Sequence, residues 1–306
     1  MAHRQINCGA VLPGGTAPDQ LELARLAESA GWDGVFVWEA AYGPDAWSML
    51  AAMAARTERV RLGTMLTPLP WRRPWKVASQ VATLDQLSGG RAILAAGVGA
   101  TSTGLPDTGE ARVLRDRAEM LDEGIDLIRM LWAGGTSFHG RHYDYETSRL
   151  DLTRAASPVQ RRIPIWVVGV WPALKSMRRA LRCDGVIPEY RPIDYQPVPS
   201  DASAVRTWLS EQGASDDFDI IADGETSALD QAAADSVAAW ADAGCTWWLE
   251  TRWDARVQMA ERLAVGPPRA AIRSSFPARG VEAQDHLDDR ALADRLRSLH
   301  RHLDGH

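Results

Sequence analysis

Cysteine is scarce in this chain of 306 residues, and long apolar runs are missing. Cys8, Cys183 and Cys245 lie far apart without CxxC spacing, so the sequence predicts no disulfide framework and no metal site, as is typical of a reducing compartment. No run of 18 apolar residues occurs, which argues against a membrane-spanning helix. The first residues lack a charged segment followed by an apolar one, so we expect no signal peptide and a cytoplasmic protein.

A large excess of positive charge is also missing. The formal net charge is -6 and the isoelectric point is near 5.7, which disfavours nucleic acid or an anionic membrane as the main partner. The sequence has no GxSxG, Walker or Rossmann fingerprint, so nucleophilic acyl transfer and phosphoryl transfer are disfavoured as well. A small molecule is the partner that remains.

Strand and helix signals alternate along most of the chain. We expect strands at 6–12, 34–38, 62–67, 92–96, 165–169, 185–188, 218–222 and 246–250, and helices at 19–30, 44–56, 75–87, 111–132, 172–183, 201–213, 230–243 and 255–263. Eight strand–helix repeats in about 265 residues predict an α/β protein with a (β/α)8 TIM barrel. Residues 133–162, with hairpin character at 136–143, would form an insertion before the fifth strand.

The barrel pattern ends at Gly266 and the two prolines after it. We therefore divide the chain into a barrel at 1–266 and a C-terminal extension at 267–306 that contains an amphipathic helix from about residue 284. One side of that helix carries leucines at heptad spacing, namely Leu292, Leu296, Leu299 and Leu303. They would form either a dimer contact or a face that folds back on the barrel.

Residues 62–99 are the segment most informative about function. They predict a right-handed βαβ unit in which a helix joins two buried parallel strands. Chemistry in such units gathers at the carboxyl ends of the strands, which here are residues 64–68 and 97–100. Tryptophans also follow several expected strands, at Trp38, Trp71, Trp75, Trp171 and Trp253, and they would either wall an apolar pocket or simply pack.

Several motifs of this chain occur together in one known family. They are Leu62-Gly63-Thr64, Arg73-Pro74-Trp75-Lys76, Leu87-Ser88-Gly89-Gly90-Arg91, Arg117 to Gly124, Gly140-Arg141-His142-Tyr143, Pro158-Val159-Gln160, Ile163 to Val167, Asp184-Gly185-Val186 and Thr246 to Glu250. In these motifs, over about residues 6–268, the sequence resembles the bacterial-luciferase-like superfamily of flavin- and deazaflavin-dependent oxidoreductases. The resemblance implies the same barrel with an insertion before the fifth strand, and commonly a homodimer.

The resemblance also implies where a cofactor would bind. The ring of coenzyme F420 or FMN would lie against the ends of the third and fourth strands, on a bulge with a non-prolyl cis peptide at Met65-Leu66. The candidate cofactor-binding residues are Thr64, Met65, Leu66, Gly97, Gly99, Val168, Gly169 and Trp171. The small residues of the fourth strand would either leave room for a ring or allow close packing. An FMN-dependent enzyme would also need a separate flavin reductase.

Two departures from the family pattern affect this expectation. Members often carry an acidic residue and then His after the second strand, whereas this chain has Glu39 followed by Ala40. Relatives that read Gly-Arg-Trp-Pro-Asn-Arg after the fifth strand hold the cofactor phosphate there, whereas this chain has apolar residues at the arginine and asparagine positions, with Lys175 next. The free N–H groups of the following helix would still favour an anion.

Titratable side chains near the expected barrel mouth supply the candidate chemistry. Glu39 is the candidate catalytic residue, either as a proton donor with a raised pKa or as a structural hydrogen-bond acceptor. For Glu250 the sequence favours an ion pair with an arginine. The candidate substrate pocket consists of Trp38, Tyr42, Trp71, Glu189, Asp223, Glu250 and Trp253. His139 and His142 fall in the hairpin, and no metal site is predicted.

Three functions remain open from the sequence. The first is a luciferase-like oxidoreductase in which F420 delivers hydride, or FMN activates oxygen, on a partly apolar small molecule. The second is a cofactor-free enzyme on the same barrel that catalyses cyclisation, isomerisation or elimination. The third is a binding protein without catalytic activity.

Overall fold

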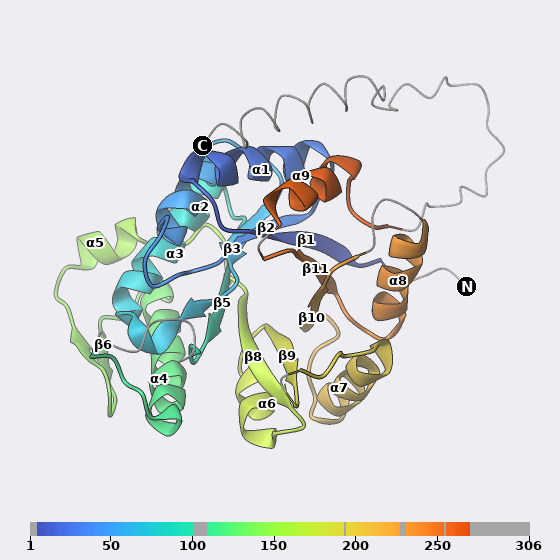
Figure 1. Ribbon diagram of the computed structural model, residues 1–306. Coiled ribbons are helices and arrows are strands. Elements are labelled where there is room, and N and C mark those ends of the chain that lie inside the picture. The colour runs from blue at the N-terminus through green and yellow to red at the C-terminus, as the bar shows by residue number, and fades with distance from the viewer. Residues whose placement is uncertain (1–4, 101–108, 193, 227–230, 254, 270–306) are drawn as a thin grey trace, which may run out of the picture.

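The structure is a computed structural model that describes residues 5–100, 109–192, 194–226, 231–253 and 255–269. Its strands and helices follow one another around a closed barrel, with the helices outside the strands (Figure 1). The barrel strands are β1 (Asn7–Leu12), β2 (Gly34–Val37), β3 (Arg61–Thr64), β5 (Ala92–Gly97), β8 (Ile165–Trp171), β9 (Gly185–Tyr190), β10 (Asp219–Gly224) and β11 (Trp247–Thr251).

These strands are parallel, and their order around the barrel is β3-β2-β1-β11-β10-β9-β8-β5. The pairing of Leu62 with Ala92 closes the ring between β3 and β5. The helices that cover it are α1 (Ala17–Ser29), α2 (Ala46–Ala54), α3 (Pro74–Ser88), α4 (Leu114–Trp132), α6 (Leu174–Ala180), α7 (Pro199–Glu211), α8 (Gln231–Asp242) and α9 (Arg256–Val265). The predicted (β/α)8 barrel is therefore confirmed.

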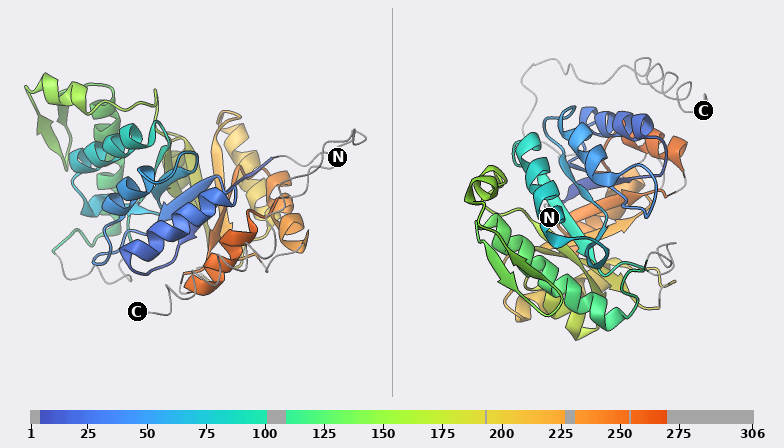
Figure 2. Two further views of the ribbon diagram at one scale, coloured as in Figure 1. Left: turned by 90° about the horizontal axis from the view of Figure 1, so that it is seen from above. Right: turned by 90° about the vertical axis from the view of Figure 1, so that its left-hand side faces the viewer.

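The expected insertion lies between α4 and β8. It consists of the hairpin strands β6 (Ser137–His139) and β7 (Asp144–Glu146), followed by α5 (Leu150–Ala155), a helix that the sequence pattern did not predict. It extends from the barrel beside α3 and α4 (Figure 2). The leucine-bearing helix expected after residue 284 lies outside the described residues. Within those residues, no helix is both long and apolar enough to cross a bilayer.

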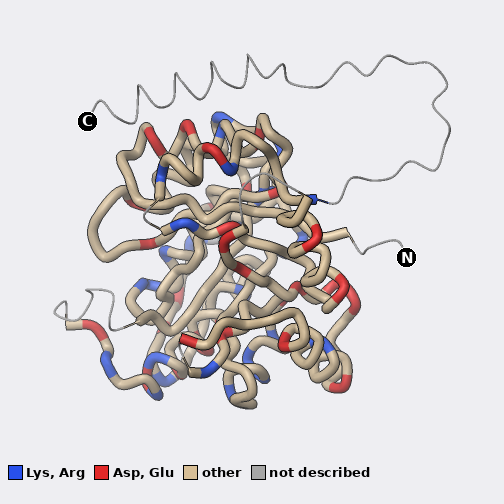
Figure 3. Tube along the Cα trace, turned by 45° about the vertical axis from the view of Figure 1, so that its right-hand side comes forward, with Lys and Arg blue, Asp and Glu red and all other residues tan. Residues whose placement is uncertain are grey.

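The strands bury side chains on both faces. Alternate residues point outward to one cluster beneath the helices and inward to a second cluster that fills the barrel. Three aromatic rings dominate the interior, with the Phe36 and Trp166 centroids 5.4 Å apart and Trp247 edge-on to both. Charged residues of both signs lie around the periphery, while the central strands hold few (Figure 3).

Local sequence signals set the bounds of α3, the helix of the βαβ unit. Pro74 starts it, and Gly89 ends it at a φ of 67°, a conformation that glycine adopts without steric cost. Its buried face contains Val77, Val81 and Leu84, whereas Leu87 at the same spacing is 55% exposed. The helix is therefore as predicted, but its last leucine faces solvent because the buried stripe passes through Ser88 instead.

The turn after α3 is fixed by a buried guanidinium. Arg91 donates hydrogen bonds to the carbonyl oxygens of Ala54, Thr57, Val60 and Ser88. Because a buried charge needs such partners, Arg91 anchors the start of β5 to the α2–β3 turn. This fixes where β3 and β5 end, and hence where the mouth between them lies.

Gly63 tests the packing inside the barrel. A Cβ built at this position would lie 2.6 Å from the carbonyl oxygen of Ile93 on the neighbouring strand, a backbone atom that cannot move aside cheaply. We expect Gly63→Ala to lower the free energy of unfolding by about 1–3 kcal/mol, measured by urea denaturation. Gly14→Ala, whose Cβ would meet nothing within 4 Å, is the matched control. Equal stability of the two variants would contradict this account of the interior.

Candidate active site

The chain bulges where β3 ends. Met65 and Leu66 interrupt the strand, the peptide between them is cis, and pairing resumes at β4 (Thr67–Pro68), where Thr67 pairs with Ala96 of β5. The non-prolyl cis peptide implied by the family resemblance is thus present at the expected position. The bulge turns both side chains toward the barrel mouth, where they line a recess.

Two buried threonines fix the bulge from either side. The Thr67 hydroxyl donates to Glu39 Oε2 at 2.7 Å, and the hydroxyls of Thr64 and Thr67 lie 2.9 Å apart. Thr64 Oγ1 also lies 3.2 Å from the carbonyl oxygen of Ala95 on β5. The bulge is therefore tied to the residue that follows β2 on one side and to β5 on the other.

Glu39 is almost buried, at 9% exposure, and has a second charged partner. Its Oε1 lies 3.0 Å from Arg72 Nη1, and Arg72 also donates to Gln80. Burial raises the pKa of Glu39, while Arg72 and the Thr67 hydroxyl act in the opposite direction. Trp47 Nε1 also acts to lower the pKa of Glu39. This N–H group does not meet hydrogen-bond geometry with the carboxyl, and it has no other hydrogen-bond partner in the described chain.

The bulge forms the floor of a recess of about 250 Å³ at the carboxyl ends of the strands. Predicted site residues that line it are Trp38, Glu39, Met65, Leu66, Trp71, Gly97, Gly99, Val168, Glu189 and Trp253. Pro68, Val98 and Ala100 also line it and were not among the candidates. They belong to the strand-end segments 64–68 and 97–100, so the position of the strand ends was the signal that could have found them.

The glycines of β5 and the turn after it accommodate side chains of this chain. A Cβ at Gly97 would lie 2.8 Å from Leu66 Cδ1, and one at Gly99 would lie 2.3 Å from the Trp71 ring. Gly99 also has a φ of 76°, which favours glycine. The small residues therefore allow Leu66 and Trp71 to pack closely, and the ring of Trp71 covers the end of β5.

Trp71 is held firmly in that position. Its Nε1 donates to the carbonyl oxygen of Ala111 at 3.2 Å, and the Arg117 guanidinium lies 5.5 Å from its ring centroid. Arg117 in turn donates to the carbonyl oxygens of Val98 and Gly99. Within the described chain no carboxylate pairs with this guanidinium, which is only 5% exposed. Trp71 is thus a fixed wall of the recess.

Strand alternation turns three predicted cofactor contacts away from the recess. The Thr64 side chain points outward from β3, and its hydroxyl forms a hydrogen bond with the Thr67 hydroxyl beside the bulge. On β8, Trp166 and Val168 point inward, so Gly169 and Trp171 point outward. A Cβ at Gly169 would lie 2.7 Å from Met177 Sδ, and the Trp171 ring packs edge-on against Trp208 of α7.

Three predicted pocket residues also do not line the recess. Tyr42 is 99% exposed on the loop after β2. Glu250 points outward from β11 and is fully buried, where it accepts hydrogen bonds from Thr226 and forms an ion pair with Arg252 at 3.1 Å. The arginine partner favoured for Glu250 is thus present. Asp223 is open to solvent at the end of β10, yet the surrounding protein desolvates it enough to raise its pKa.

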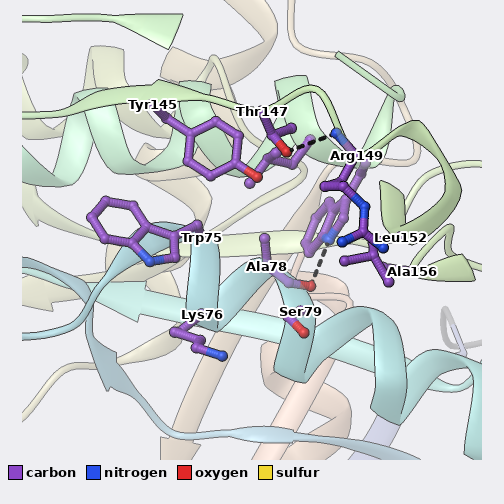
Figure 4. Close-up of a pocket in the computed structure, with 11 residues that line it drawn as sticks. Trp75, Lys76, Ala78, Ser79, Tyr145, Thr147, Arg149, Leu152 and Ala156 are labelled. Atoms are coloured by element: carbon purple, nitrogen blue, oxygen red, sulfur yellow. Dashed lines mark hydrogen bonds between the residues drawn. The ribbon is translucent and has the colours of Figure 1, made fainter. Parts of the chain in front are cut away.

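Trp75, which was expected near the mouth, lines a different hollow. This hollow measures about 320 Å³ and lies outside the barrel, between α3, α4 and the insertion (Figure 4). Its walls include the rings of Trp75 and Tyr145, whose centroids are 6.2 Å apart. Because it is separate from the strand ends, it is not part of the candidate active site.

The turn from β8 to α6 offers little for a phosphate. Ser176 Oγ is engaged with the N–H and the carbonyl oxygen of Val170, and α6 has only seven residues. Ala173, the residue before α6, and Leu174, its first residue, are both apolar. Lys175 is the cation of this turn, and its side chain is exposed.

The fold and the mouth together define a (β/α)8-barrel protein with a largely apolar recess of about 250 Å³ above a cis-peptide bulge. The profile of the family described as luciferase-like monooxygenases matches residues 5–296. The chain therefore belongs to the luciferase-like monooxygenase family.

Among curated proteins, a "putative coenzyme F420-dependent oxidoreductase" of Mycobacterium tuberculosis is 32% identical over 72% of this chain and 66% of its own length. An F420-dependent glucose-6-phosphate dehydrogenase of Beutenbergia cavernae is 42% identical over 45% of this chain and 47% of its own length. The chain thus spans between about half and two thirds of these relatives. Among solved structures, an F420-dependent secondary alcohol dehydrogenase in complex with an F420-acetone adduct has a TM-score of 0.68 at 18% identity, covering 87% of this chain and 99% of its own. At this identity the likeness shows the fold.

The raised pKa of Glu39 predicts a pH dependence of stability. Its unfolded-state value is about 4.3, so the folded chain holds the proton to higher pH than the unfolded chain does. The contribution of Glu39 to the free energy of unfolding therefore falls as pH rises from about 4.3 through the raised pKa. Urea unfolding from about pH 4 to 8 should show Glu39→Gln gaining stability relative to the unmodified chain as pH rises. Glu211→Gln, at the exposed end of α7, should show no such trend in this window, and a flat difference for Glu39→Gln would refute the prediction.

Proposed function

We propose that this protein is a deazaflavin- or flavin-dependent oxidoreductase that binds the cofactor ring in the recess. The observation that carries the proposal is the bulge at Met65-Leu66, which presents an apolar floor between β3 and β5. Val168 extends that floor to β8. A concave, mostly apolar site with a few polar groups is the usual form of a cofactor site.

The residues on the β5 and β8 side of the mouth fit a bound deazaflavin or flavin. A bound deazaflavin or flavin would supply hydride transfer, or in the case of FMN the activation of oxygen. Arg117, which has no carboxylate partner in the described chain, and the exposed Lys175 put positive charge on the side of β5 and β8. Coenzyme F420 is our first candidate because the named relatives depend on it.

The other residues would orient substrate and manage a proton. Glu39 reaches the recess, and its raised pKa suits a group that gives or takes a proton. Trp71 would exclude water from the side of β5. We expect a partly apolar small molecule as substrate, a homodimer as the assembly, and a separate flavin reductase if FMN is the cofactor.

A second candidate function is supported by one observation. Leu66 and Trp71 already fill the space over Gly97 and Gly99, where a ring would otherwise have most room. An enzyme that has lost its cofactor could use the remaining recess and its carboxylates for a non-redox step such as isomerisation. Retention of a cofactor by the purified protein decides between the two candidates.

Cofactor binding is the direct test. We expect F420 or FMN to stay with the protein through gel filtration, detected by ring absorbance, and to titrate by fluorescence. Val168→Phe would place a larger side chain in the recess and should weaken ring binding about tenfold or more, or about 1.4 kcal/mol. Val159→Phe, on an exposed position 59% accessible, is the control. If neither cofactor binds and the protein still turns over a substrate, the proposal is wrong.

The proton role of Glu39 predicts a kinetic effect. Glu39→Gln keeps the shape of the side chain but cannot exchange the proton, so we expect kcat to fall about 100-fold with a small change in cofactor affinity. Glu211→Gln makes the same side-chain change at the exposed end of α7, outside the recess, and should leave kcat unchanged. Unchanged turnover in Glu39→Gln would leave Glu39 with only its structural hydrogen bonds.

A further inference from the structure

The barrel order divides the mouth into two sides. One side is the side assigned to the cofactor. It consists of three neighbours in the ring of strands, namely the bulge, the end of β5 and Val168 of β8. The opposite side is formed by the ends of β9, β10, β11 and β2, and its recess-lining side chains include Glu189, Trp253 and Trp38. A substrate that reacts with the cofactor ring must contact this second side.

Two carboxyl groups lie level with each other on that side. In the pairing of β10 with β9, Asp219 lies opposite Gly185 and Ile220 opposite Val186, so the same register puts Asp223 level with Glu189. Ile221 and Ile187 belong to the interior cluster, and residues two positions further along each strand share that inward face. Asp223 and Glu189 therefore both face the mouth.

The cations near this side are already engaged. Arg191 lies 2.9 Å from Glu189, and Arg252 pairs with the buried Glu250. Among the described residues, no lysine or arginine lies within ion-pair distance of Asp223. Within the described part of the chain, the second side therefore carries a carboxylate without a counter-charge.

Aromatic faces accompany this carboxylate. Trp38 is 44% exposed and Trp253 is 47% exposed, and both line the recess. An indole face attracts an ammonium or iminium group through its quadrupole, and most strongly where water is partly excluded. Neutral apolar ligands would gain from the rings alone, whereas anions would be repelled by Asp223 and Glu189.

We propose that this half of the mouth selects a cationic substrate, an amine or iminium attached to an apolar group, through Asp223, Trp38 and Trp253. The inference rests on the proposed function, because it names the substrate class of the same site. It also separates this chain from the glucose-6-phosphate dehydrogenases among its relatives, since a phosphorylated sugar would bring two negative charges toward unpaired carboxylate. A bound cation would supply the ion-pair partner that Asp223 lacks among the described residues.

Calorimetric titration of the purified full chain tests the proposal. The probes are benzyltrimethylammonium, the neutral benzyl alcohol, and the anions benzoate and glucose 6-phosphate, each with and without F420. We expect the cation to bind about tenfold more tightly than the alcohol, and both anions to bind more weakly than the alcohol. Anions that bind as tightly as the cation would overturn the proposal.

Two variants and one control variant locate the residues that cause the preference for the cation. Asp223→Asn should reduce the preference for the cation over the alcohol to about threefold or less while leaving affinity for the alcohol unchanged. Asp216→Asn makes the same charge change just before β10, at the opposite end of the barrel, and should preserve the preference. Trp253→Leu, at a half-exposed position where folding is not at risk, should also lower it. A cation preference that survives in both Asp223→Asn and Trp253→Leu refutes the assignment.

Ring absorbance in the same samples keeps the two proposals apart. If F420 or FMN is retained and no probe shows charge preference, the substrate assignment fails while the oxidoreductase proposal stands. If the cation preference is present and no cofactor is retained, the substrate assignment stands and the redox function fails.

Discussion

The hydrogen-bond chain from Glu39 through Thr67 and Thr64 is the constraint on which the mouth depends. Because it joins the end of β2 to both flanks of the bulge and to β5, it fixes where Met65 and Leu66 point. These groups are buried, so each unpaired donor or acceptor would be costly, and the network holds the bulge in one arrangement. The recess floor, and the position of any ring above it, follow from that arrangement.

Electrostatics then distinguishes the two sides of the mouth. Arg117 and Lys175 lie toward β5 and β8, whereas Glu189 and Asp223 face inward from β9 and β10. An anionic cofactor on the first side and a cationic substrate on the second would each meet opposite charge. Glu39 already has Arg72 as an ion-pair partner, so it is less suited than Asp223 to bind a charged ligand, while its burial favours the protonated form.

Local sequence signals were enough to predict the barrel and the bulge. The alternation of short apolar runs with helical periods was enough for the barrel, and the family motifs were enough for the bulge at Met65-Leu66. The outward orientation of three predicted site residues has one common cause. Thr64, Gly169 and Glu250 stand at strand ends, as predicted, but the two-residue alternation of each strand turns their side chains outward. The insertion helix α5 was missed because its six residues are too few to show a helical period.

The sequence by itself determined the order of elements, the strand ends at which the site forms, and the family. Those features depend on local periodicity and on motifs that adjacent residues carry. Only the tertiary structure decided which strand-end residues share the recess, that Trp71 covers Gly99, and that Asp223 lies level with Glu189. These depend on the register between strands far apart in the chain and on ring packing across the barrel, neither of which is encoded in any single stretch of residues.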